Sequence, residues 1–309
     1  MFDLNLKDKV ILITGGSDGL GFASARLLSE QGAKVIICGR REDYLKEKAN
    51  LIREETNNEI LDIQCDVTNP DQCKNLVEQT ISKFNNIDVL VNNAGSSAAF
   101  GFESVSDENW EEDINLKLMA AIRMCRLVLP YMKSRKSGSI INAAIGGGKA
   151  PNASQLPTSV TRAAGLNLTK SLSNEYAPFN VRVNAICIGL IKSSQWERKA
   201  HNSDVDTLYQ ELSKKVPMGE VGEEIDQTGG RVEDSEHFIG RRSAVRVGPR
   251  RAVRVQNSGD WVQGPEPDES IVGVRRDVSV QDPREEEEKE VVEEEIGRRW
   301  GGRECGGDG

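Results

Sequence analysis

The first 218 residues alternate between short apolar runs and longer amphipathic stretches, and this alternation limits the fold more than any other feature of the chain. Apolar residues between the runs recur at helical spacing, as at Leu20, Ala23, Leu27 and Leu28. Continuously apolar strands that alternate with helices predict a parallel sheet covered on both faces. We therefore expect an α/β fold with a doubly wound parallel sheet that binds ligands at the carboxyl ends of its strands. The six expected strands are Val10–Thr14, Lys34–Cys38, Ile60–Cys65, Ile87–Val91, Ile140–Asn142 and Val181–Ile186.

The composition changes abruptly after Met218. Residues 1–218 hold 26 acidic and 26 basic residues, whereas residues 219–309 hold 23 acidic and 14 basic residues and so carry the whole net charge of −9. The second part contains no Leu and 15 of the 29 Gly, so it can bury little apolar surface against the entropy of ordering it. We predict a folded domain over residues 1–219 and a low-complexity, Arg/Glu/Gly-rich acidic tail over residues 220–309 that is disordered or weakly structured.

Several classes of protein are disfavoured by composition. The acidic balance argues against nucleic acid or an anionic membrane as a partner. The chain has no apolar run long enough for a transmembrane helix, and its first residues do not resemble a secretory signal. The six Cys form no CxxC pair, so free thiols in the cytoplasm are expected and a metal site is not.

A glycine-rich turn joins the first expected strand to the first expected helix, with the sequence Thr14-Gly15-Gly16-Ser17-Asp18-Gly19-Leu20-Gly21. Glycine lets the backbone turn tightly and lets a pyrophosphate approach it closely. The helix that follows offers unpaired N–H groups and a partial positive charge. Because the turn lies between a strand and a helix, it predicts a dinucleotide-binding, Rossmann-type site; the alternative is an ordinary glycine-rich connection.

The end of the second strand favours NADP(H) over NAD(H). A carboxylate at this position would bind an unmodified adenosine ribose, but here Gly39 is followed by Arg40 and Arg41. A guanidinium can bind a 2′-phosphate through two parallel hydrogen bonds. The alternative is a solvated arginine pair, and Asp18 in the glycine turn would repel an additional phosphate.

Together these features resemble the short-chain dehydrogenases/reductases. The resemblance rests on TGGSDGLG, on Asp66-Val67 after the third strand, on Asn92-Asn93-Ala94-Gly95 after the fourth, and on the stretch from Val183 to Ser193. It covers residues 6–219 and implies a nicotinamide cofactor and hydride transfer to or from a small carbonyl or alcohol. The cofactor-binding positions that it implies are Gly15, Gly16, Ser17, Asp18, Gly19, Leu20, Gly21, Arg40, Arg41, Asp66, Val67, Asn93, Ala94, Gly95, Arg162 and Ile191.

The catalytic positions differ from the family pattern, which has a Tyr, a Lys four residues later and a Ser thirteen residues before the Tyr. Alignment of Arg162-Ala163-Ala164 with the family's Lys-Ala-Ala puts Thr158 at the Tyr position, Arg162 at the Lys position and Ile145 at the Ser position. Asn115, in the DINLK stretch, matches the family's Asn.

Each replacement changes the chemistry that the position can perform. The Thr158 hydroxyl can relay a hydrogen bond but has no accessible ionisation. Arg162 keeps five donors and a positive charge for the ribose, whereas Ile145 offers no donor to a developing oxyanion. Thr158 and Arg162 are four residues apart and share one helix face, although Thr158 also suits the first turn of a helix.

The family's last helix and strand have no counterpart after Gly219. We therefore expect a sheet without its last strand and an exposed edge, and a homo-oligomer becomes doubtful. Lys and Asn give way to Arg and Gly at this boundary, as a change from A-rich to G/C-rich codons would produce. We hypothesise that residues 220–309 come from a shifted reading frame or a foreign sequence.

Three functions remain open at this stage. The first is an NADP(H)-dependent oxidoreductase with a non-standard active site. The second is a non-catalytic NADP(H)-binding protein, because the usual proton donor is replaced. The third is a defective product of a frameshifted gene.

Overall fold

The computed structural model describes residues 4–193, 196–197 and 204–222. The chain divides into two units, Met1–Pro249 and Arg250–Gly309, and every described residue belongs to the first. The predictions for the acidic tail and for the absent last strand concern residues beyond 222, which lie outside the described part.

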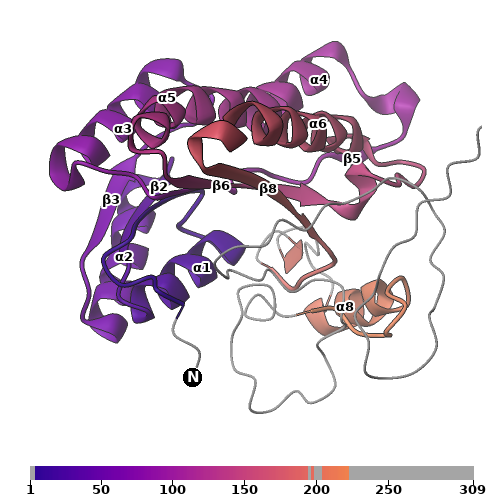
Figure 1. Ribbon diagram of the computed structural model, residues 1–309. Helices are drawn as coiled ribbons and strands as arrows, with labels where there is room; N and C mark the ends of the chain where they lie inside the picture. The colour runs from indigo at the N-terminus through magenta and orange to yellow at the C-terminus, as the bar shows by residue number, and fades with distance from the viewer. Residues whose placement is uncertain (1–3, 194–195, 198–203, 223–309) are drawn as a thin grey trace, which may run out of the picture. The chain divides into compact units, whose positions relative to one another are not determined.

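A six-stranded sheet forms the centre of the domain, as Figure 1 shows, in the order β3-β2-β1-β4-β6-β8. All five neighbouring pairs are parallel, which confirms the predicted doubly wound, Rossmann-type sheet. The order reverses between β1 and β4, where ligands bind in folds of this kind. The strands are β1 (Val10–Thr14), β2 (Lys34–Gly39), β3 (Ile60–Gln64), β4 (Val89–Asn92), β6 (Gly138–Ile145) and β8 (Val181–Ile188).

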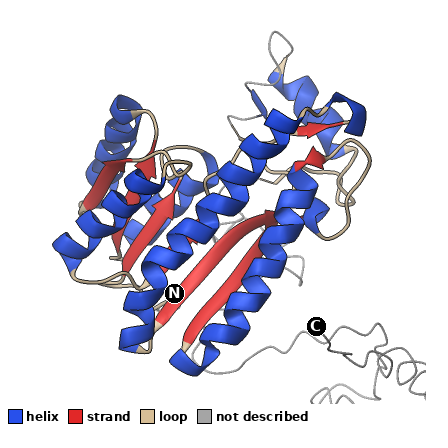
Figure 2. Cartoon of the chain, turned by 90° about the horizontal axis from the view of Figure 1, so that it is seen from above, coloured by secondary structure: helices blue, strands red, loops and turns tan. Residues whose placement is uncertain are grey.

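Helices lie on both sides of this sheet (Figures 1 and 2). The first two helices along the chain, α1 and α2, pack on one face of the sheet, and α3, α5 and α6 pack on the other face. The chain changes face where the strand order reverses. A two-stranded ribbon joins β5 (Ala99–Phe100) to β7 (Leu156–Pro157). None of the described helices is long and apolar enough to span a membrane. The helices are α1 (Gly19–Glu30), α2 (Glu42–Thr56), α3 (Pro70–Phe84), α4 (Asp107–Ile114), α5 (Ala120–Arg135), α6 (Thr158–Tyr176) and α8 (Val205–Ser213).

The apolar core has two main parts, one on each face of the sheet. Leu45, Ala49 and Ile52 of α2 pack against the β1 and β2 side chains of one face. Leu76 of α3 and Met124 of α5 belong to the larger cluster on the other face. All five residues of β1 are buried, which explains why its sequence is continuously apolar.

The outermost described strand, β8, differs from the central ones. Val181 and Val183 are buried, whereas Arg182 and Asn184, which alternate with them, are exposed. This alternation shows that β8 packs on one face only, and the expected cover on both faces does not hold for it among the described residues.

The apolar residues Ile114, Leu118, Ile122, Cys125 and Leu129 recur at the spacing of one long helix, but the structure interrupts this helix. A π-helical turn (Asn115–Met119) separates α4 from α5. Turns of this kind occur mostly inside α-helices and often at functional sites. The apolar spacing alone did not reveal it, because one wide turn hardly disturbs the helical period.

Leu90 of β4 tests the central core, because its side chain is 0% exposed. We expect Leu90→Ala to lower the free energy of unfolding by about 3 kcal/mol, through lost burial and the cavity that it leaves. Leu51→Ala on α2 is the matched control, since Leu51 is 36% exposed, and should cost less than about 1 kcal/mol. Urea unfolding of the two variants measures the difference, and equal costs would contradict the described packing.

Candidate active site

The glycine turn lies at the carboxyl edge of the sheet, between β1 and α1. Gly15 and Gly19 have φ angles of 65° and 53°, in the left-handed region that favours glycine. Asp18 caps α1, and its carboxylate accepts a hydrogen bond of 3.0 Å from the Gly19 N–H. The Gly16 N–H donates to the Cys38 carbonyl at 3.0 Å, which fastens the turn to β2. The turn therefore presents a fixed helix N-terminus of the kind that binds phosphate.

Side chains are excluded from this turn by its close contacts. A Cβ at Gly21 would lie 2.2 Å from the Gly15 carbonyl oxygen, and one at Gly16 would lie 2.6 Å from Ile37 Cγ2. The backbone is thus bare where a pyrophosphate would approach, so the turn fits a dinucleotide.

Thr14 and Asn93 join the turn to the end of β4. The Thr14 hydroxyl accepts hydrogen bonds from the N–H groups of Asn93 (3.0 Å) and Ala94 (3.1 Å). Asn93 Nδ2 donates to the carbonyls of Thr14 and Gly15, both at 3.1 Å. Both hydrogen bonds hold the Asn93 side-chain nitrogen at the turn. If Asn93 binds the cofactor, as the family resemblance implies, its side-chain oxygen is the atom that remains for the contact.

The end of β2 carries the residues expected to choose the cofactor. A Cβ at Gly39 would lie 2.9 Å from Ser17 Oγ, so a carboxylate side chain at this position would displace Ser17. Arg40 is exposed, and within the described residues its guanidinium forms no ion pair. Arg41 Nη2 lies 4.0 Å from Asp18 Oδ2. Asp18 is thus bound to a helix end and faces an arginine, which reduces the repulsion expected toward a phosphate.

Asp66 and Val67 follow β3 at the same edge. Asp66 Oδ1 accepts hydrogen bonds from the N–H and the hydroxyl of Thr68, at 2.9 and 2.7 Å. The Val67 side chain is buried. Asp66 therefore shapes the loop, and its backbone is also bound within it, because its N–H donates to Gln72 Oε1 and its carbonyl accepts from the Asn69 N–H.

The thiols near this edge are unsuited to nucleophilic chemistry. The hydrogen bond with Cys38 and burial raise the pKa of Cys65 to about 12, and the hydrogen bond with Cys65 and burial raise that of Cys73 further. Burial raises the pKa of Cys125 to about 12. All described cysteines are free, and no group of ligating side chains in the described part could hold a metal ion.

A buried polar cluster surrounds Thr158, at the start of α6. Lys117 Nζ donates to Thr158 Oγ1 at 2.6 Å and forms an ion pair with Asp113. Asp113 also accepts hydrogen bonds from the hydroxyls of Thr158 (3.3 Å) and Thr161 (2.5 Å). The Ala98 N–H donates to Thr158 Oγ1 at 3.1 Å. These side chains connect the π turn, α4 and α6, and they place an ammonium beside the hydroxyl at the family's Tyr position.

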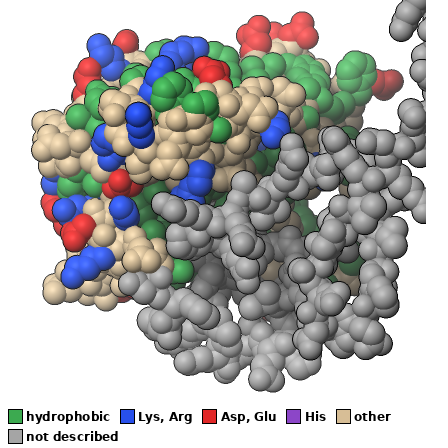
Figure 3. Space-filling model, viewed as in Figure 1, with side chains coloured by type: hydrophobic (Ala, Val, Ile, Leu, Met, Phe, Trp, Pro, Cys, Tyr) green, Lys and Arg blue, Asp and Glu red, His purple; other side chains and the backbone are tan. Residues whose placement is uncertain are grey.

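Asp113 is unusual among the acidic residues of its helix. The other four in α4 are exposed, and Figure 3 shows acidic side chains gathered over this helix. Asp113 is only 4% exposed and Lys117 only 5%. Transfer of a charge from water into the protein interior costs free energy unless the charge is paired and hydrogen-bonded. The ion pair and the threonine hydroxyls therefore replace the water that these two charges would otherwise bind.

Arg162 lies one turn beyond Thr158 on α6. Its Nη1 donates to the Ala143 carbonyl of β6 at 2.7 Å, and its Nη2 would lie 2.6 Å from a Cβ at Gly95. Burial lowers the pKa of the guanidinium, and the Asp113 carboxylate partly offsets this effect. Its buried Nε has no hydrogen-bond partner in the described part of the chain. The guanidinium thus lies between β6 and Gly95, with a buried donor that no described group satisfies.

The remaining predicted residues lie around this centre. Ile145 ends β6, and Asn115 begins the π turn. Ile191 is buried and pairs in parallel with Gly222. The structure therefore brings Thr158, Arg162 and Gly95 to one end of the sheet, and Ile145 ends β6 with an aliphatic side chain.

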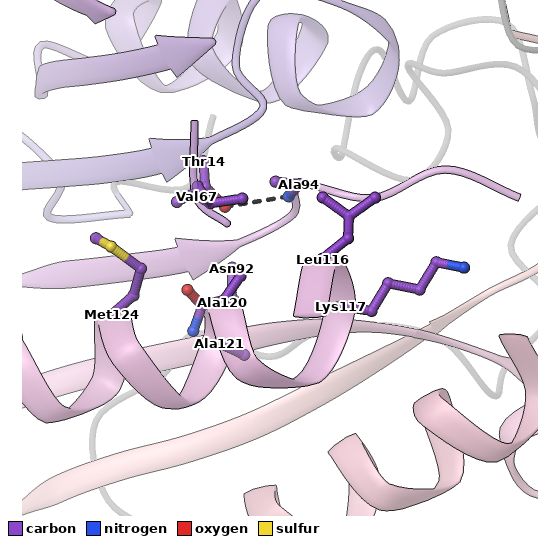
Figure 4. A pocket seen from close by; sticks show the side chains of 9 residues that line it. All are labelled: Thr14, Val67, Asn92, Ala94, Leu116, Lys117, Ala120, Ala121 and Met124. Carbon is purple, nitrogen blue, oxygen red and sulfur yellow. Dashed lines mark hydrogen bonds between the residues drawn. The ribbon is translucent and has the colours of Figure 1, made fainter. Parts of the chain in front are cut away.

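A small cavity lies behind the cluster, between the end of β4 and the start of α5 (Figure 4). It has room for about one water molecule. Asn92 Nδ2 donates to Asn142 Oδ1 at 2.9 Å, and Asn92 Oδ1 is buried without a partner in the described part. Figure 4 shows the Lys117 side chain extending away from Asn92, so the ammonium lies outside this cavity.

Sequence reasoning missed Lys117, Asp113 and Thr161. A signal was present, since Asp113 and Lys117 are four residues apart in DINLK and so share a helix face. Such a pair is usually solvated, and only the position of α6 shows that this one is buried.

Comparison with known proteins identifies the family. The short chain dehydrogenase family matches residues 9–204. A 3-oxoacyl-[acyl-carrier-protein] reductase FabG of Thermotoga maritima is 32% identical over 229 residues, which cover 72% of this chain and 89% of that protein. The mouse dehydrogenase/reductase SDR family member 4 is 32% identical over 210 residues, which cover 66% of this chain and 75% of that protein.

Solved structures agree with this match. L-sorbose reductase of Gluconobacter frateurii, in complex with NADPH and L-sorbose, superposes with a TM-score of 0.70 at 31% identity, over 74% of this chain and 89% of that one. A short chain oxidoreductase of Pseudomonas aeruginosa with an atypical catalytic center, bound to NADPH, has a TM-score of 0.67 at 32% identity, over 72% and 89% of the two chains. The resemblance seen in the motifs is confirmed, and the chain belongs to the short chain dehydrogenase family.

Proposed function

We propose that this protein is an NADP(H)-dependent oxidoreductase that interconverts a small carbonyl compound and its alcohol through a non-standard active site. The observation that carries the proposal is the buried Lys117–Asp113 pair, whose ammonium donates to the Thr158 hydroxyl at 2.6 Å. The cluster thus contains an ionisable donor although the family's tyrosine is replaced.

The described edge of the sheet supports the proposed preference for NADP(H). The glycine turn leaves bare backbone for a pyrophosphate, and Gly39 is followed by Arg40 and Arg41 rather than by a carboxylate. Asn93 Nδ2 is bound to the turn, which leaves Asn93 Oδ1 for a ribose hydroxyl, and Arg162 would supply the positive charge nearby. The bound nicotinamide supplies the hydride for reduction and accepts it in the reverse direction.

Proton transfer is the part performed by the chain's own residues. In carbonyl reduction, the Thr158 hydroxyl turns its proton from Asp113 to the substrate oxygen and receives one from Lys117 Nζ through the existing hydrogen bond. Lys117 is then neutral and takes up a proton from water before the next turnover. Asp113 orients Lys117 and keeps it in place when its charge changes. Arg162 and Asn115 complete the surroundings of the cofactor, while Ile145 provides only an apolar wall.

The relatives support a small-molecule substrate. L-sorbose reductase was solved with L-sorbose and NADPH, and the Pseudomonas aeruginosa oxidoreductase shows that this fold accommodates an atypical catalytic center. We expect a carbonyl or alcohol substrate, and no nucleic acid or membrane as a partner. The free, buried thiols favour the cytoplasm as location.

A non-catalytic NADP(H)-binding protein is the second candidate, and Ile145 favours it. Loss of one hydrogen-bond donor to an oxyanion commonly costs about 3–4 kcal/mol of barrier. A panel of ketones, aldehydes and sugars, followed by NADPH absorbance, separates the two functions. Consumption of NADPH supports the oxidoreductase, and tight NADPH binding without turnover of any compound supports the second candidate.

We expect the purified chain to bind NADPH, and Gly21→Ala to weaken this binding by about tenfold or more, about 1.4 kcal/mol, because the added Cβ meets the Gly15 carbonyl. Gly165→Ala in α6 is the matched control, since nothing lies within 4 Å of its Cβ position. It should leave binding unchanged and stabilise the helix by up to about 1 kcal/mol. Fluorescence titration measures the affinities, and absence of NADPH binding by the unmodified, folded chain would refute the proposed function.

Lys117 is tested best together with Asp113, because removal of one partner would leave a buried charge. We expect Asp113→Asn/Lys117→Met to reduce kcat by about 100-fold or more, the usual contribution of a general acid, while the Kd for NADPH changes little. The exposed lysine of α6 provides the control Lys170→Met, which should retain full activity. An unchanged kcat in a folded double variant would exclude Lys117 as the proton donor.

A further inference from the structure

Arg41 is held between two neighbours although its side chain is 63% exposed. Its Cζ lies 4.1 Å from the centre of the Tyr44 ring, and its Nη2 lies 4.0 Å from Asp18 Oδ2. Tyr44 is half-buried in the first turn of α2, three residues after Arg41. An exposed arginine ordinarily loses side-chain entropy when it binds a ligand, and the stacked ring restricts Arg41 beforehand.

The two contacts differ in what a bound phosphate would do to them. The Asp18 contact is long and partly exposed, so it is a weak ion pair that a doubly charged phosphate can replace. The Tyr44 contact places the guanidinium carbon over the ring, and a guanidinium stacked on an aromatic face keeps its N–H edges for hydrogen bonds. Arg41 can therefore exchange a carboxylate for a phosphate while the ring keeps it in place.

The position of this group points to one part of the cofactor. Arg41 follows Gly39 and Arg40 at the end of β2, the position from which side chains contact the adenosine ribose in folds of this kind. Arg40 has no ring beneath it and forms no ion pair in the described part of the chain. Of the two arginines, Arg41 is thus the one whose geometry is set before a ligand arrives.

We propose that Tyr44 is a positioning residue for the adenosine 2′-phosphate: it holds the Arg41 guanidinium flat and so contributes to the preference for NADP(H) over NAD(H). The inference rests on the proposed function, because it assigns a determinant of cofactor choice. Tyr44 acts through Arg41 and needs no contact with the nucleotide.

The test compares Tyr44→Leu with Tyr44→Phe, which keeps the aromatic face. Titration with NADPH and with NADH should show that Tyr44→Leu raises the Kd for NADPH by about two- to fivefold, the size of an exposed cation–π contact, and leaves the Kd for NADH unchanged. Tyr44→Phe should restore the original Kd for NADPH. Tyr131→Leu is the matched control, because Tyr131 is an exposed tyrosine of α5 at 38% exposure. Calorimetry with adenosine 2′,5′-bisphosphate and with 5′-AMP repeats the comparison without the nicotinamide.

The other possible outcomes would contradict either the proposed role of Tyr44 or the proposed function. Equal weakening of NADPH and NADH by Tyr44→Leu would show a structural role only, and an unchanged ratio of the two Kd values would overturn the role of Tyr44. If Tyr44→Phe is as weak as Tyr44→Leu, the aromatic face is not the cause. Absence of NADPH binding by the unmodified chain overturns the proposed function itself, so the two failures are distinguishable.

Discussion

The hydrogen bonds that join the ends of β1 and β4 hold the site together. Thr14 and Asn93 connect these strands where the order of the sheet reverses, and they also fix the glycine turn. This junction helps to position two groups at the carboxyl edge. The glycine turn leads directly into α1, and the chain after β4 leads to Gly95, which lies next to Arg162. The proposed dinucleotide site and the proposed catalytic cluster would therefore share one support made of regular elements, as precise sites usually require.

The proposed chemistry of the site depends on several residues together, and no single sequence position reveals it. In the proposed mechanism, Thr158, a hydroxyl that does not ionise, stands at the position of the usual tyrosine, and the Lys117 ammonium that donates to it would supply the proton. Asp113 makes the burial of that ammonium tolerable, and Thr161 satisfies the second carboxylate oxygen. We expect these four residues to act as a unit, so the effects of single substitutions should not add.

The fold and the cofactor side of the site could be predicted from the sequence, because both depend on local patterns. The strand Val10–Thr14 was predicted with its observed bounds, and the glycine turn lies between a strand and a helix as expected. The polar cluster could not be predicted, since Asp113 and Lys117 look like a solvated helix pair until α6 packs over them. The π turn that begins at Asn115 could not be predicted either, because its extra residue hardly changes the spacing of the apolar residues.

The half-exposed strand β8 has a consequence for how the protein behaves at high concentration. Natural sheets discourage edge-to-edge association with charged side chains on their outer strands. Arg182 is an exposed charge within β8, beside buried Val181 and Val183. A second molecule that extended the sheet would have to bring two such charges close together, so Arg182 opposes the growth of the sheet into an aggregate.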